Sequence, residues 1–224
     1  IVDPKMLPWI SVNDPKTMES LPKSLTAATG IDALTHAIEA YVSTQATPIT
    51  DASALYAIKL IKEHLPIVYR DGSNMISRKM MAYAQFLAGM AFSNASLGYV
   101  HAIAHQLGGF YNLPHGVCNA LLLPHVIEFN GSQLKGNRMG EIYEAFGGKP
   151  INKQNQIATK NLVKAIKDMN QDLDIPKSLK ELGVKPEDFY TIATNALKDS
   201  CALTNPVQTD VHGMIKILEK AYRC

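Results

Sequence analysis

Helical patterning through most of the 224 residues predicts an all-α protein with a short extended segment at its start. Apolar residues recur at helical spacing from residue 24 onward, and Gly, Pro and Asn separate the periodic stretches. Alternating β-branched runs are absent after the first dozen residues. We expect about eight to ten helices in a domain at 24–224, preceded by a proline-rich extended segment at 1–23.

The first three helices follow from their apolar periodicity and their ends. Residues 24–43 ("SLTAATGIDALTHAIEAYVS") place Ala and Leu at helical spacing and end before the polar "TQATPIT". Residues 51–72 begin with a capping Asp51 and stop at an Asp-Gly pair. Residues 76–95 are nearly uncharged beyond the first turn, which predicts a helix buried at the centre of the domain.

Two apolar helices are expected next, at 98–109 and 114–130, separated by a Gly-Gly break. Pro114 stands near the start of the second helix, and we expect Pro124 to kink or end it. Later amphipathic patterns predict the remaining helices at 132–147, 153–171, 186–199 and 208–222.

Composition excludes several classes of protein. The net charge is only +2 and no basic run occurs, so nucleic acid is not an expected partner. No segment approaches the roughly 20 apolar residues that a membrane span needs. Three scattered cysteines without a CxxC motif indicate unpaired thiols and a reducing, cytoplasmic setting.

Two helical pairs bear potential metal ligands. Asp32 and His36 are four residues apart, as are His101 and His105, so the members of each pair project from one helix face. His115 lies between Pro and Gly, where a helix start can aim its side chain. Their neighbours are apolar, and a polar group buried among them costs several kcal/mol unless it is paired or binds a metal.

The alternative is that these histidines are core residues. A single histidine on an apolar helix is more often hydrogen-bonded than metal-bound, and we assign no role to His64 and His212. His125 is ambiguous, but it has no partner at ligand spacing. The short spacings therefore leave both interpretations open. If a metal binds, one carboxylate with imidazoles and no thiolate suits Fe²⁺ or Zn²⁺ and argues against Mg²⁺ or Ca²⁺. Because structural zinc usually recruits cysteine, this donor set indicates a catalytic site.

Longer motifs resemble a known family. "ATGIDALTHAIEAYVS", "AGMAFSNASLGYVHAIAHQLGGFYNLPHGVCNALLLPHV" and "CALTNP" are similar to the iron-containing (group III) alcohol dehydrogenases. The similarity runs in order through almost the whole chain and matches the helical C-terminal metal domain of that family. The chain opens with Ile-Val-Asp-Pro rather than Met, and no Gly-rich phosphate loop follows. We therefore expect that the family's N-terminal nucleotide-binding domain is missing here.

The resemblance implies four metal ligands and three further site residues. The ligands are Asp32, His36, His101 and His115. His105 corresponds to a histidine beside the ligands, where nicotinamide and substrate meet, and is a candidate proton relay. Phe92 and Cys201 match positions that line the cofactor and substrate pocket, although core packing and an inert buried thiol are the alternatives for these two.

For the complete enzyme, the resemblance implies NAD- or NADP-linked hydride transfer between a small alcohol and its aldehyde or ketone, assisted by Fe²⁺ or Zn²⁺. Homodimers are common in such families, although this sequence has no interface signature. The chain alone is expected to bind metal without catalysing turnover. Two competing hypotheses are a non-catalytic helical metal-binding fragment and an all-α metal-dependent hydrolase. The second is disfavoured because no adjacent His-Asp doublet occurs.

Overall fold

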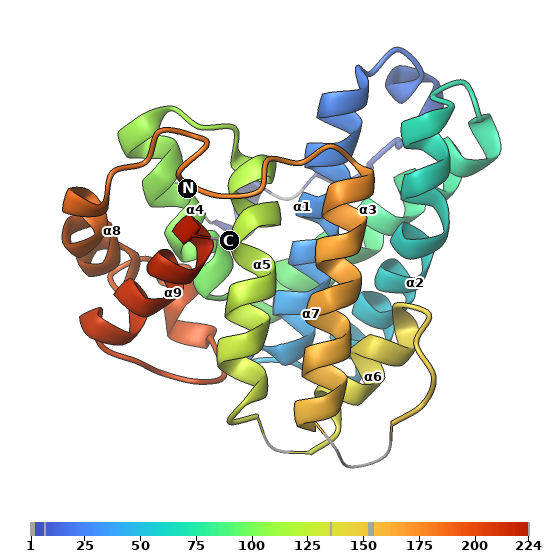
Figure 1. Cartoon of the computed structure of the whole chain (residues 1–224). Coiled ribbons are helices and arrows are strands. Elements are labelled where there is room, and N and C mark those ends of the chain that lie inside the picture. Colours follow the sequence, from blue (N-terminus) through green and yellow to red (C-terminus); the bar gives the residue numbers. More distant parts are fainter. Residues whose placement is uncertain (1–2, 7, 135, 152–154, 224) are drawn as a thin grey trace.

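The computed structural model describes residues 3–6, 8–134, 136–151 and 155–223, and within these ranges it contains nine α-helices and no strand. The prediction of an all-α fold with eight to ten helices is therefore confirmed. Figure 1 shows their arrangement. The helices are α1 (Lys23–Val42), α2 (Pro48–Arg70), α3 (Met75–Ala95), α4 (Tyr99–Tyr111), α5 (His115–Gly131), α6 (Arg138–Ala145), α7 (Asn155–Asp172), α8 (Phe189–Ala196) and α9 (Val211–Arg223).

The predicted extended segment contains some local helical structure. Two short 3₁₀ turns occur before α1, η1 at Pro4–Met6 and η2 at Pro15–Met18. Asp14 starts η2, because its carboxylate accepts a hydrogen bond from the Lys16 backbone N–H at 3.0 Å. The remaining described residues before Lys23 form no helix or strand, while residues 1, 2 and 7 lie outside the described part.

The start of α2 differs from the prediction. The helix begins at Pro48, and Thr47 rather than Asp51 caps it. Thr47 and Thr50 exchange hydrogen bonds between side chain and backbone in a capping box, and Pro48 tolerates the first position because it needs no N–H partner. Asp51 lies in the first turn instead, where it forms an ion pair with Arg138 of α6.

Pro124 neither ends nor divides α5. The helix continues to Gly131 with this proline in its interior, and every residue from Cys118 to Ile127 is buried. α5 packs against α1, α4, α7 and α9, so tertiary contacts on several sides hold it in spite of the missing N–H.

α3 is not buried at the centre of the molecule, contrary to the expectation from its composition. A row of small residues that includes Ala84, Ala88 and Ala91 packs it against α1 and α2. On its other side, Tyr83 and Met90 are among several large apolar residues that stay exposed. The lack of charged residues indicated an apolar helix, but it did not show that other helices cover only part of its surface.

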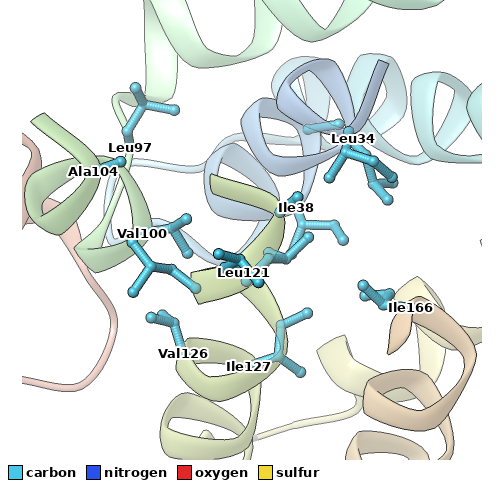
Figure 2. Packing of buried hydrophobic residues seen from close by; sticks show 14 of the residues in the cluster. Leu34, Ile38, Leu97, Val100, Ala104, Leu121, Val126, Ile127 and Ile166 are labelled. Atoms are coloured by element: carbon cyan, nitrogen blue, oxygen red, sulfur yellow. The ribbon is translucent and has the colours of Figure 1, made fainter. Parts of the chain in front are cut away.

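One continuous core joins the helices. Figure 2 shows Leu34 and Ile38 of α1, Leu121 and Ile127 of α5 and Ile166 of α7 in this cluster, and all five are buried. The core fixes α1 against α5, and α4 packs on α5 from another side. No helix in the described residues is sufficiently long and apolar to span a bilayer. The junction of α1, α4 and α5 is where the candidate ligands lie.

Candidate metal centre

Three helices bring the four candidate ligands together. α1 contributes Asp32 and His36, α4 contributes His101, and α5 begins with His115. The Oδ1 atom of Asp32 lies 3.5 Å from Nε2 of His101, 3.6 Å from Nε2 of His115 and 3.9 Å from Nε2 of His36. The i,i+4 pair on α1 thus meets histidines that are distant in the sequence.

The spacing of these atoms fits a small divalent ion. With metal–ligand distances of about 2.1 Å, neighbouring ligands in a tetrahedral site lie about 3.4 Å apart. The distances from Asp32 to the three imidazoles are close to that value. Ligand atoms of Asp32, His101 and His115 also lie within 4.8 Å of one another, whereas His36 lies outside this group, with its Nε2 3.9 Å from Asp32.

Aromatic stacking holds His36 in its place. Its ring lies 4.4 Å from the ring of Phe92 on α3 and 4.5 Å from the ring of His101, both nearly parallel. His101 is 1% exposed, so its imidazole is fixed by the packing around it. Phe92 therefore contacts a candidate ligand directly, in addition to packing against the core.

Asn119, one turn after His115 on α5, completes the polar cluster. Its amide nitrogen donates a hydrogen bond to Asp32 Oδ1 at 2.6 Å and lies 3.0 Å from Nε2 of His115 and 3.2 Å from Nε2 of His101. Its amide oxygen is buried without a hydrogen-bond partner. Acceptor atoms of Asp32, His101 and His115 thus converge on one point, where the donor group of Asn119 now lies and where a cation could take its place.

Electrostatics in the cluster favour a bound positive charge. Burial would raise the pKa of Asp32, but its hydrogen bond with His101 and the nearby histidines outweigh it and lower the pKa to about 2. Burial and the neighbouring His101 lower the pKa of His36 to about 4. For His101, burial opposes the charged form, yet hydrogen bonds with Asp32 and Glu39 raise its pKa to about 9. A metal ion would compete with this proton.

His105 occupies a different position from its i+4 partner. Its ring stacks on that of His115 with centroids 5.4 Å apart, but its Nδ1 lies 2.8 Å from Oδ2 of Asp199. The same carboxylate accepts a hydrogen bond from the backbone N–H of Cys201 at 2.9 Å. Burial and Asp199 raise the pKa of the Cys201 thiol to about 12, so this sulfur stays protonated at neutral pH. The Nδ1 atom of His105 is therefore held by Asp199, while its ring lies against the candidate ligand His115.

A pocket of about 510 Å³ reaches the cluster from the α1–α3 side. Asp32, His36 and Phe92 form part of its wall, together with apolar residues such as Leu65 and Met81 and the polar Arg78 and Gln85. The His105 side chain, which stacks on His115, is 42% exposed. The pocket therefore gives access to the cluster, and a histidine beside the candidate ligands is partly open to solvent.

The first turn of α5 approaches α1 at a glycine. A Cβ atom on Gly116 would lie 2.3 Å from the backbone oxygen of Ala28, which is closer than any non-bonded contact allows. Ala28 is one turn before Asp32 on α1, and His115 adjoins Gly116 on α5. The absence of a side chain at this position lets the two helices hold Asp32 and His115 at their observed distance.

Sequence reasoning missed three polar residues that contact the candidate site: Glu39, Asn119 and Asp199. Glu39 follows Asp32 by two turns on the same helix, and Asn119 follows His115 by one turn, so both lie at ligand spacing on faces already singled out. No spacing in the sequence pointed to Asp199, because its contact with His105 arises only from the tertiary fold.

Comparison with known proteins agrees with this arrangement. The profile of the Fe-containing alcohol dehydrogenase family, C-terminal, matches residues 26–222. Alcohol dehydrogenase 4 from Saccharomyces cerevisiae is 55% identical over 223 residues, covering 99% of this chain and 57% of that protein. The 1,3-propanediol dehydrogenase of Klebsiella pneumoniae is 47% identical over 224 residues, with the same coverage.

A solved structure gives the same answer for the fold. The crystal structure of a 1,3-propanediol oxidoreductase superposes with a TM-score of 0.93 at 47% identity, covering 96% of this chain and 56% of that chain. By its fold and its candidate site, this chain is a helical domain that holds an Asp–His cluster between three helices. The chain belongs to the Fe-containing alcohol dehydrogenase family and corresponds to its C-terminal domain. It spans little more than half the length of these relatives.

Proposed function

We propose that this chain is the metal-binding part of an NAD(P)-linked alcohol dehydrogenase that interconverts a small alcohol and its aldehyde or ketone. The observation that supports this most strongly is the position of Asp32 Oδ1, which lies 3.5 to 3.9 Å from three imidazole nitrogens at the junction of α1, α4 and α5. Membership of the alcohol dehydrogenase family supplies the reaction class.

Asp32, His36, His101 and His115 would hold the ion, which we propose to be Fe²⁺ or Zn²⁺. When bound, such an ion supplies Lewis acidity toward an alcohol or carbonyl oxygen. Phe92, Leu65 and Met81 give the 510 Å³ pocket an apolar part of its wall beside the cluster, which suits the hydrocarbon part of a small substrate.

His105 is the proposed proton-transfer group. Asp199 holds its Nδ1, so Nε2 is the nitrogen left to exchange a proton with substrate or water. The imidazole is partly exposed and stacks on His115, which places it beside the candidate ligands without being one of them. Cys201 is anchored to the same carboxylate through its backbone, and we propose that it lines the nicotinamide side of the site.

The nicotinamide cofactor, NAD or NADP, would be held largely by the part of the relatives that this chain does not cover. We accordingly propose residues 24–224 as the metal domain and 1–23 as the segment that leads into it. A homodimer and a cytoplasmic location belong to the same proposal. The free thiols of Cys118 and Cys201 are compatible with a reducing compartment.

Elemental analysis of the anaerobically purified chain tests the proposal. We expect about one Fe or Zn per polypeptide, as a single four-ligand site requires. Asp32→Ala and His115→Ala should lose the metal, whereas Glu63→Gln, on an exposed part of α2, should retain it. A wild-type chain that binds neither ion, or an Asp32→Ala chain that retains a full complement, would refute the assignment.

A further inference from the structure

Glu39 is a buried carboxylate in the middle of an apolar stretch of α1. It is 3% exposed, and its immediate neighbours in the sequence are Ile38 and Ala40. Burial of an ionised carboxylate is costly unless its oxygens are hydrogen-bonded or paired with charge. The position therefore requires a physical reason, which its two partners provide.

Both carboxylate oxygens of Glu39 accept hydrogen bonds from the first turn of α4. Oε1 accepts from the backbone N–H of Val100 at 2.7 Å, and Oε2 lies 2.6 Å from Nδ1 of His101. Gly98, which precedes α4, has no side chain that could cap the helix. Glu39, which belongs to α1, instead accepts a hydrogen bond from one of the free backbone N–H groups at the start of α4. A negative charge at this end is also favoured by the helix dipole.

The chain leaves room for this contact at Gly98. A Cβ atom there would lie 2.9 Å from Oε1 of Glu39 and 2.8 Å from the side-chain oxygen of Asn205. Asn205 itself accepts a hydrogen bond from the backbone N–H of Tyr99 at 3.3 Å. The start of α4 is thus held by two buried side chains that need a glycine beside them.

The contact determines how His101 can act. An ionised carboxylate only accepts hydrogen bonds. Nδ1 of His101 must therefore carry a hydrogen, which it donates to Oε2 of Glu39. Nε2 is then the nitrogen directed toward Asp32, 3.5 Å away. The hydrogen bond at one nitrogen of a ligating imidazole selects the other nitrogen for the metal, fixes the ring orientation and increases its basicity.

We propose that Glu39 is a positioning residue of the metal centre: through Nδ1 of His101 it fixes the nitrogen and the ring orientation offered to the ion, and it adds a second buried negative charge beside it. This inference rests on the proposed function, since it assumes that His101 is a ligand. It assigns to Glu39 a role in metal retention in addition to its role in capping α4.

The test compares metal binding by the wild-type chain with that of Glu39→Gln and Gly98→Ala, with Glu63→Gln as the control. The last variant also removes one carboxylate, but from an exposed side chain outside the cluster. Zn²⁺ affinity is measured by competition with a chromophoric chelator, and the ligand field by the visible absorption of Co²⁺-loaded protein. Circular dichroism verifies that each variant is folded.

We expect Glu39→Gln to bind Zn²⁺ about 10- to 100-fold more weakly, the range typical of lost partners behind a metal ligand, and to show a shifted Co²⁺ spectrum. Gly98→Ala keeps the carboxylate but displaces it, and should weaken binding in the same direction. Glu63→Gln should match wild type in both measurements.

A folded Glu39→Gln chain with the Zn²⁺ affinity and the Co²⁺ spectrum of wild type would overturn the inference. If Glu39→Gln does not fold, unchanged Zn²⁺ binding by Gly98→Ala would overturn it instead. Failure of the wild-type chain to bind Zn²⁺ or Co²⁺ is a different result, because it would refute the proposed metal centre itself and the inference with it.

Discussion

Replacing Gly116 by alanine should open the candidate metal site without removing any of its ligands. The new methyl carbon would lie 2.3 Å from Ala28 O and 2.7 Å from Ala28 C. Both atoms belong to the backbone of a buried helix, so no side chain can rotate away. The start of α5 must therefore recede from α1 by about 1 Å to restore an ordinary contact distance.

This displacement acts directly on the ligand distances. His115 adjoins the substituted residue, and its Nε2 now lies 3.6 Å from Asp32 Oδ1. An increase of about 1 Å exceeds the tolerance of roughly 0.5 Å within which a functional site must be held. We expect Zn²⁺ affinity to fall at least about ten-fold, and the free energy of unfolding of the metal-free chain to fall by about 1–3 kcal/mol through overpacking.

Gly109→Ala is the matched control, because Gly109 is also helical but a Cβ atom there would meet nothing within 4 Å. It should leave Zn²⁺ affinity unchanged and stabilise the chain by about 0.5–1 kcal/mol through the better helix propensity of alanine. Chelator competition measures the affinity, and urea titration measures the stability. If Gly116→Ala binds Zn²⁺ as tightly as wild type, the argument from helix approach is wrong.

Three further outcomes are expected. Acid should destabilise the metal-free chain through His125, whose pKa is lowered to about 4 by burial and by the nearby Lys167. Between about pH 6.5 and 4 the unfolded chain takes up a proton that the folded chain excludes, so about 3 kcal/mol of stability is lost as the pH falls. Urea titrations should show that His125→Gln loses about 3 kcal/mol less stability than wild type between pH 6.5 and 4, and an equal loss in both would contradict the assignment. Zn²⁺ at 100 times its Kd should raise the unfolding free energy by about 2.7 kcal/mol, and calorimetry should detect no such gain in Asp32→Ala. His105→Ala should retain wild-type metal content by elemental analysis whereas His101→Ala should lose it; equal loss in both would remove the distinction between them.

Local patterning predicted the position of a helix well where the helical periodicity and both helix ends are encoded in one short stretch of sequence. The helix expected at 24–43 is observed at Lys23–Val42, because both its periodicity and its ends are encoded within twenty residues. Burial of the helix at 76–95 was predicted wrongly, since apolar composition indicates how much surface can be buried and not how many neighbours are present. Tyr83, Phe86 and Met90 on this helix remain exposed.

For the candidate site, too, the local sequence showed which residues share a helix face but not which residues from other helices surround them. Spacing placed Asp32 and His36 on one face, and the structure agrees, with their side chains 3.9 Å apart. Spacing could not separate His101 from His105, which are equally placed on α4. Their difference is tertiary: His101 is enclosed between Glu39 and Asp32, while His105 turns to Asp199. Contacts of this kind join residues about 60 to 95 positions apart, so no local window contains them.

The meeting of α1, α4 and α5 at one cluster also has a consequence for assembly. Asp32 and Asn119, which touch across the cluster, are separated by 87 residues. An ion bound there would join these distant segments of the folded chain and close the long loops between them, and the stabilisation it adds follows from its free concentration relative to its Kd. Unlike a disulfide, this closure is reversible and depends on the free concentration of the ion. Metal scarcity would then make the folded chain open more often, so that its susceptibility to proteolysis would report the supply of metal around it.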